Sequence, residues 1–172
     1  MRAARLFICL ALTLPLLASA QTPELRIPSF DDLQHKAIDS VNLTIDSTLL
    51  GLAGQFVPDS DPHSAELKKT LAGLKYVQVR SFRFDSDFAY SKSDIDSVRT
   101  QLAAPEWTRL VQVRDHNKNE DVDVYLALDQ HVIKGVAIIT SDPRKFTIVN
   151  VVGTVDMSQI AQLQKAFAAA GT

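Results

Sequence analysis

The chain has 172 residues, of which 18 are basic and 20 acidic, so its net charge is −2 with neutral histidines. This weakly acidic balance gives no electrostatic footprint for nucleic acid, and we expect no nucleic-acid partner. The single cysteine, Cys9, has no second cysteine with which to form an intramolecular disulfide.

The first twenty residues are typical of a secretory signal. Arg2 and Arg5 give a positive start, residues 6–17 are apolar, and the three residues that end at Ala20 have the small-x-small pattern of a cleavage site. This apolar run is shorter than the roughly 20 residues that span a bilayer, and no longer one follows, so we expect no transmembrane segment. The sequence therefore predicts cleavage between Ala20 and Gln21 and export to the periplasm or beyond.

Removal of the signal, residues 1–20, leaves 152 residues from Gln21 to Thr172, the size of one ordinary domain. The signal also takes Arg2 and Arg5, so the mature chain has 16 basic and 20 acidic residues and a net charge of −4. With Cys9 lost, the mature chain has no thiol for nucleophilic chemistry or metal binding. We expect a single domain over residues 21–172.

Capping residues followed by apolar residues at helical spacing predict four helices, the first of which ends near Ser40. These helices start at Ser29, Asp61, Ser91 and Asp156. The cap at Ser91 is reinforced by Asp94 three residues later, which is the spacing of a capping box. An apolar stretch from Leu49 to Phe56 predicts a further helix.

Alternating or continuous apolar residues predict six strands. Their ranges are Val41–Ile45, Tyr76–Phe84, Trp107–Arg114, Asp121–Asp129, Val132–Thr140 and Phe146–Val155. Three short links join the last four strands, which predicts a four-strand antiparallel meander. The sequence therefore predicts an α+β fold, an antiparallel sheet with this C-terminal meander and with helices packed on it.

Two strands have patterns that place their side chains. In Asp121–Asp129 the polar positions Asp121 and Asp123 share a face with Tyr125, which predicts that this face is solvated. In Tyr76–Phe84 the apolar phase shifts after Val79, which predicts a bulge near Arg80 or a change of covering layer.

No catalytic or metal-binding motif is present in the sequence. The four histidines lack the i, i+4 spacing that would present two imidazoles to zinc, and nucleophile elbows and phosphate-binding glycine loops are missing. We expect no cofactor and no metal site. The weak candidates for ligand or partner binding are Arg109, Asp123 and Tyr125, since alternation places Arg109 on the side of Val111 in a strand next to Asp123.

Basic residues are common in the predicted strands. If they shared a face, they would form a positive patch suited to a carboxylate or an anionic partner. The simpler expectation is that they pair with aspartates of neighbouring strands. The residues concerned are Arg80, Arg83, Arg109, Arg114 and Lys134.

An ordered series of segments resembles the DUF4252 family of exported bacterial proteins, over roughly Leu25 to Leu163. The segments are Val41–Asp46, Leu49–Ala53, Leu71–Lys75, Val79–Phe82, Tyr90, Trp107–Arg114, Val122–Leu128 and Val149–Gly153. The resemblance implies a bacterial envelope or secreted protein with an α+β domain, and supplies no catalytic or ligand residues. Similar proteins are often encoded near regulators of transcription initiation, which implies a link to envelope signalling.

The leading hypothesis is a non-enzymatic interaction or accessory module that binds a protein partner in the envelope, through its sheet or the region around Asp59. One alternative is a hydrolase with a site assembled around Arg109, Asp123 and Tyr125. Another is a carrier of a small apolar ligand, which requires a cavity of about 300 Å³ or more. The residues expected to line that cavity are Phe56, Leu71, Phe82 and Phe84.

Overall fold

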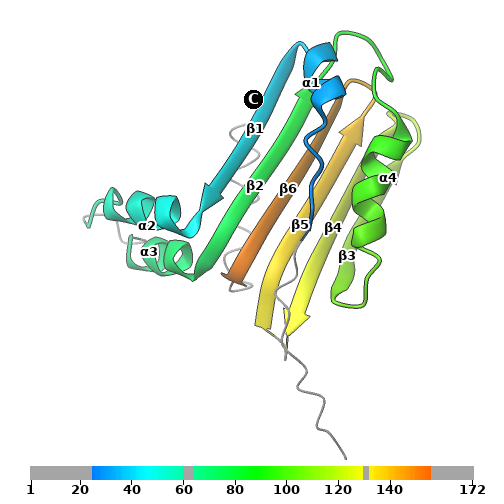
Figure 1. Ribbon diagram of the computed structural model, residues 1–172. Coiled ribbons are helices and arrows are strands. Elements are labelled where there is room, and N and C mark those ends of the chain that lie inside the picture. Colours follow the sequence, from blue (N-terminus) through cyan, green and yellow to red (C-terminus); the bar gives the residue numbers. More distant parts are fainter. Residues whose placement is uncertain (1–24, 60–63, 130–131, 156–172) are drawn as a thin grey trace, which may run out of the picture.

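The computed structural model describes residues 25–59, 64–129 and 132–155. Within these residues the chain forms four helices and six strands (Figure 1). The helices are α1 (Asp31–Lys36), α2 (Ser47–Gln55), α3 (Ser64–Gly73) and α4 (Lys92–Gln101). The strands are β1 (Asp39–Asp46), β2 (Leu74–Arg83), β3 (Trp107–Asp115), β4 (Glu120–Asp129), β5 (Val132–Asp142) and β6 (Lys145–Val155). The signal and the helix predicted to start at Asp156 lie outside the described residues.

All six strands belong to one antiparallel sheet in the order β1-β2-β6-β5-β4-β3. The consecutive strands β3 to β6 pair with one another in turn, which confirms the predicted C-terminal meander. The last strand, β6, also pairs with β2 and so joins the meander to the β1–β2 pair. The predicted α+β fold is confirmed.

The sheet carries a different apolar cluster on each face. We call one the aromatic face, because Phe82, Phe84 and Phe146 lie there under Leu33 of α1 and Ile95 of α4. Figure 1 shows α1 and α4 on this same side of the sheet. We call the other the valine face. Its buried residues include Leu126, Val136, Val149 and Val151, with Leu50 of α2.

The phase shift predicted in β2 is a change of covering layer. Val77 and Val79 pack on the valine face, whereas Phe82 packs on the aromatic face. The β1–β2 register is continuous from Asp39 to Asp46, so there is no bulge at Arg80.

The first helix is shorter than the pattern from Ser29 to Ser40 predicts. Phe30 precedes α1 in a left-handed conformation with φ of 56°, and its ring packs 5.8 Å from Phe82 and 5.5 Å from Phe146, centroid to centroid. The helix ends at Lys36 because β1 begins three residues later. Packing of Phe30 and pairing of β1 therefore override the helical pattern at both ends.

The other described helices follow their sequence patterns more closely. The capping box of α4 is confirmed, since Asp94 accepts a hydrogen bond from the Ser91 backbone N–H at 2.8 Å. The stretch Leu49–Phe56 lies in α2 and the residue after it, with Asp46 accepting from Leu49 N–H as the helix cap. For α3, the cap predicted at Asp61 lies outside the described residues.

Candidate interaction surface

Two of the three predicted site residues touch each other. The guanidinium carbon of Arg109 lies 5.4 Å from the centroid of the Tyr125 ring, a cation–π distance. This contact exists because the β3–β4 register shifts between Arg109 and Val111. Before the shift Arg109 lies opposite Tyr125, and after it Val111 lies opposite Val124 on the other face. The expectation that Arg109 and Val111 share a side is therefore wrong.

The third residue, Asp123, is 0% exposed, so the prediction that its face is solvated is also wrong. Its carboxylate lies between two arginines. Arg114 Nη2 donates to both oxygens at 2.7 and 2.9 Å, and Arg99 Nε donates to Oδ2 at 3.1 Å. Neither partner is Arg109. The buried, doubly paired carboxylate holds α4 against β3 and β4 and leaves no oxygen open to a substrate.

The sequence analysis did not identify Arg99 as the residue of α4 that pairs with Asp123. The signal for it was its place in α4, one residue after buried Val98 and four after buried Ile95. A side chain next to that apolar stripe lies at the border of the helix face that packs on the sheet. Its guanidinium therefore reaches the strands, with Asp121 also 3.7 Å away.

The residues predicted to line a carrier cavity do not gather around one space. Phe82 and Phe84 are buried in the aromatic face, with Phe82 5.1 Å from Phe146 between ring centroids. Phe56, by contrast, is 84% exposed. Leu71 borders a separate groove, described below.

The strand arginines mostly have partners. Arg83 pairs with Asp39 at 3.1 Å, Arg114 with Asp123, and Arg109 stacks on Tyr125. The half-buried guanidinium of Arg80 instead donates to the carbonyl oxygens of Leu43 and Val79 and to Thr44 Oγ1. Burial lowers the pKa of Arg80. Pairing with aspartates thus accounts for Arg83 and Arg114 and not for Arg80.

A hollow of about 590 Å³ lies between α1 and the loop before α4. Two of its three carboxylates are engaged, since Asp94 caps α4 and Asp31 accepts from Ser29 Oγ at 2.9 Å; the third is Asp32. Tyr90, on its wall, donates its hydroxyl to the Asp142 carbonyl, and burial with the nearby Asp142 carboxylate raises its pKa to about 12. Asp31, Asp94 and Tyr90 on its walls thus serve the fold.

An exposed surface with no charged residue lies on α2, which together with α3 we call the arm. Figure 1 shows both helices at one end of β1 and β2, projecting beyond the edge of the sheet. From Ser47 to Pro58 the sequence contains no charged residue. Leu49, Leu52 and Phe56, spaced i, i+3 and i+7, are 50%, 46% and 84% exposed.

The opposite side of α2 is apolar as well. Leu50 is buried in the cluster of the valine face, and Gly54 approaches Leu71 of α3. An open groove of about 270 Å³ runs between the two helices, lined mostly by small or apolar residues. These are Leu50, Gly51, Gly54, Gln55, Lys68, Leu71 and Ala72. A helix with apolar side chains on opposite sides is normally enclosed, whereas Leu49 and Leu52 of α2 are about half exposed.

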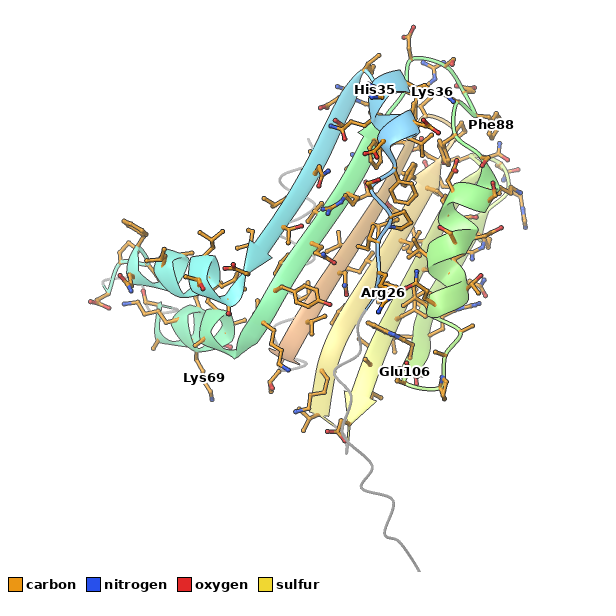
Figure 2. The ribbon with its side chains drawn as sticks, in the orientation of Figure 1. Arg26, His35, Lys36, Lys69, Phe88 and Glu106 are labelled. Atoms are coloured by element: carbon orange, nitrogen blue, oxygen red, sulfur yellow. The ribbon has the colours of Figure 1, made fainter. Side chains whose placement is uncertain are left out.

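Charged groups of the arm and its borders lie at the cap of α2 (Asp46), at the turn (Asp59) and on α3. Asp59 is bound by Lys68 at 2.5 Å, which lowers the pKa of the Asp59 carboxyl. Figure 2 shows Lys69 projecting from α3, whereas Phe88 lies far away beside the opposite end of the sheet. The region around Asp59, predicted as a possible binding region, is therefore the charged border of an apolar surface.

The described part of the chain shows no cluster of three metal-ligating side chains, and none of its helices is long and apolar enough to cross a membrane. His35 lies in α1 and His116 in the turn after β3, while His63 and His131 lie outside the described residues.

Comparison with known proteins gives the family of the chain. No curated protein and no solved structure matches it. One family model, described as a domain of unknown function, matches residues 34–163, which include all the strands and helices described above except the first residues of α1. The chain therefore belongs to the DUF4252 family.

Proposed function

We propose that this protein is an exported, non-enzymatic interaction module of the bacterial envelope that binds a protein partner through the arm. The observation that carries the proposal is the uncharged helix α2, whose Leu49, Leu52 and Phe56 are exposed together. Contiguous exposed apolar side chains on a small protein are typical of binding surfaces. The proposed export rests on the predicted signal that ends at Ala20, and a role in envelope signalling rests on the family resemblance.

The chemistry of the arm favours a partner that encloses it. Because α2 is apolar on both the Leu52 side and the Gly51 side, the partner gains most by presenting an apolar groove to the helix, as in helix-in-groove recognition. Phe56 is the expected anchor, since large aromatic side chains dominate binding energy when a partner buries them.

A protein partner is favoured over a lipid surface by the turn of the arm. The Asp59 side chain is 93% exposed three residues after Phe56. Because Asp59 pairs with Lys68, and Glu66 lies on α3 together with Lys69, the arm lacks the excess of basic residues that binds anionic lipid headgroups. In a protein interface the Asp59 carboxylate can stay at the hydrated rim.

The test is affinity capture from envelope extract with the mature chain, Gln21 to Thr172, in three forms. The wild type is compared with the arm variant Leu52→Ser/Phe56→Ser and with Phe88→Ser, which removes another exposed phenylalanine away from the arm. We expect one protein to be recovered in stoichiometric amount by the wild type and by Phe88→Ser, and lost with the arm variant. The captured partner, once purified, should bind the arm variant at least about 30-fold more weakly. Equal recovery by all three forms, or turnover of a substrate by the mature chain, would contradict the proposal.

A further inference from the structure

Arg80 holds a half-buried positive charge that pairs with no carboxylate of the residues the structure describes. Its Nη1 donates to Leu43 O at 2.8 Å and to Val79 O at 3.0 Å, and its Nη2 donates to Thr44 Oγ1 at 3.3 Å. All these acceptors are neutral. Its Nε is buried and has no hydrogen-bond acceptor. Buried charges in proteins are normally paired, so this arginine requires an explanation.

Other arginines in the described residues do not share this state. Arg26 and Arg109 are exposed to solvent. The remaining ones pair with aspartates, namely Arg83 with Asp39, Arg99 and Arg114 with Asp123, and Arg144 with Asp87. Arg80 is thus the partly buried guanidinium of the described chain that faces only neutral groups.

A second unsatisfied group lies on the neighbouring strand. Asn150 of β6 is fully buried, and its Oδ1 accepts no hydrogen bond. Its Nδ2 donates to Gln78 Oε1 across a long distance of 3.4 Å. A buried acceptor without a donor is unfavourable, and a bound group that donates to it would remove this cost.

The register places these groups together. Asn150 lies opposite Gln78, and Ile148 lies opposite Arg80, so Gln78, Arg80 and Asn150 are on the aromatic face with Arg80 and Asn150 as diagonal neighbours. Diagonal neighbours lie roughly 7–8 Å apart, within reach of long side chains. On the edge strand, Thr44 continues the same row opposite Gln78.

This part of the aromatic face is partly open. Figure 1 shows α4 and the chain before α1 in front of the meander, and no described helix in front of the middle of β1 and β2. Thr44 is exposed, and Gln78 and Arg80 are half-buried. Asn150 has no exposed surface, so a ligand that enters beside Thr44 reaches it only when the Gln78 side chain, which holds it by the long 3.4 Å contact, rotates away.

We propose that Arg80, Gln78 and Asn150 form a binding site for a carboxylate that carries a hydrogen-bond donor on its neighbouring atom. The carboxylate accepts from Arg80, and the adjacent hydroxyl or N–H donates to Asn150 Oδ1. α-Hydroxy acids, α-amino acids and the C-terminus of a peptide all have this arrangement. A single guanidinium flanked by amides suits one negative charge better than the two of a phosphate, for which proteins typically gather several donors or cations. The site is separate from the arm and does not depend on the proposed function.

The test is a titration followed by NMR of the Arg80 Nε–H and the Asn150 side-chain amide in the mature chain. Glycolate and acetate form a matched pair that differs by one hydroxyl, and N-acetylglycine represents a peptide C-terminus. We expect saturable shifts at both groups with glycolate or N-acetylglycine, and acetate about five- to tenfold weaker. Tighter binding of N-acetylglycine would identify a peptide C-terminus as the source, and tighter binding of glycolate a free acid.

Two variants separate this site from general charge effects. Arg80→Gln should abolish the shift at Asn150, whereas Arg83→Gln, whose arginine is exposed and paired with Asp39, should leave it unchanged. If Arg80→Gln fails to fold, the wild-type titration decides the matter through the Arg80 Nε–H itself. Shifts that never saturate, that are equal for acetate and glycolate, or that persist in folded Arg80→Gln would overturn the proposal.

Discussion

Arg114 Nη2 lies 2.7 and 2.9 Å from the two carboxylate oxygens of Asp123, a side chain with no solvent exposure. Arg99 approaches the same carboxylate from α4, with Nη2 2.9 Å from Oδ2. One aspartate thus connects the edge strand β3, the strand β4 and the helix α4. The stability of this side of the fold depends on an ion pair that the sequence pattern placed in solvent.

Asp123→Asn should destabilise the protein by about 3–5 kcal/mol, because it leaves two arginines without their buried counter-charge. Asp121→Asn is the matched control. Asp121 is about a third exposed and lies 3.5 and 3.7 Å from the same arginines, so its loss should cost less than about 1 kcal/mol. Urea unfolding followed by circular dichroism measures both. Equal effects of the two substitutions would show that burial of Asp123 does not set its importance.

Tyr90 should make the fold sensitive to alkali. Its pKa is raised to about 12 in the folded protein, from about 10 in the unfolded chain, because burial and the nearby Asp142 disfavour the phenolate. Between these two values the folded state holds a proton that the unfolded state has released, so stability is fully present below pH 10 and falls as pH rises towards 12. The slope of the unfolding free energy against pH in that window should be shallower for Tyr90→Phe. An identical slope would place the alkaline sensitivity elsewhere.

Substitution of alanine for two glycines, Gly51 and Gly153, should change the stability of the protein in opposite directions. A Cβ at Gly51 meets no atom within 4 Å, so Gly51→Ala should stabilise α2 by about 0.5–1 kcal/mol. Gly153 has φ of 148°, and a Cβ there would lie 2.5 Å from Gly73 O and from Leu74 Cα, so Gly153→Ala should destabilise the sheet. Thermal unfolding of the two variants, measured side by side, provides the comparison. A loss of stability in Gly51→Ala would mean that a neighbouring group needs the open space.

Asp94→Ala should lower stability by about 1 kcal/mol, because it leaves the Ser91 N–H at the start of α4 without its acceptor. For a chain of this length that corresponds to a drop of roughly 3 °C in melting temperature. Asp96→Ala, on the same helix, removes only a weak contact to Arg99 at 3.5 Å and should change the melting temperature by less than half as much. Similar drops for both variants would argue against the cap as the cause.

Sequence signals predicted the structure well where the interactions that form it lie close together in the chain. The cap at Ser91 and Asp94 lies within one helical turn, and short links fix the order of the meander, so both follow from the sequence. The predicted exposure of Asp123 was wrong because its surroundings are assembled from distant parts of the chain. The extra residue in β3 after Arg109 changes which side chains face it, and α4 docks over it from 24 positions away at Arg99. Alternation in one strand carries no information about either event.

The two candidate binding surfaces could be recognised only in part from the sequence, for the same reason. The uncharged stretch from Ser47 to Pro58 can be recognised in the sequence, but its exposure cannot, because an apolar helix normally indicates burial. Arg80 could be recognised as a strand arginine. In the structure Arg80 lies beside Thr44 and diagonal to Asn150, and not beside an aspartate. This placement depends on the pairing of β2 with a strand some seventy positions later, which the sequence pattern does not specify.

The position of β6 has a consequence for how the chain is completed during synthesis. The last strand of the described residues, β6, lies between β2 and β5, so until residues 145–155 leave the ribosome the earlier strands form two separate groups with no shared hydrogen bonds. β6 pairs with β5 through a short hairpin, whereas its pairing with β2 joins residues some seventy positions apart, and closing so long a loop is slow compared with the closure of a hairpin. A nascent chain of this design can pair β1 with β2 and join β3, β4 and β5, but it cannot unite the two groups before residues 145–155 have been made.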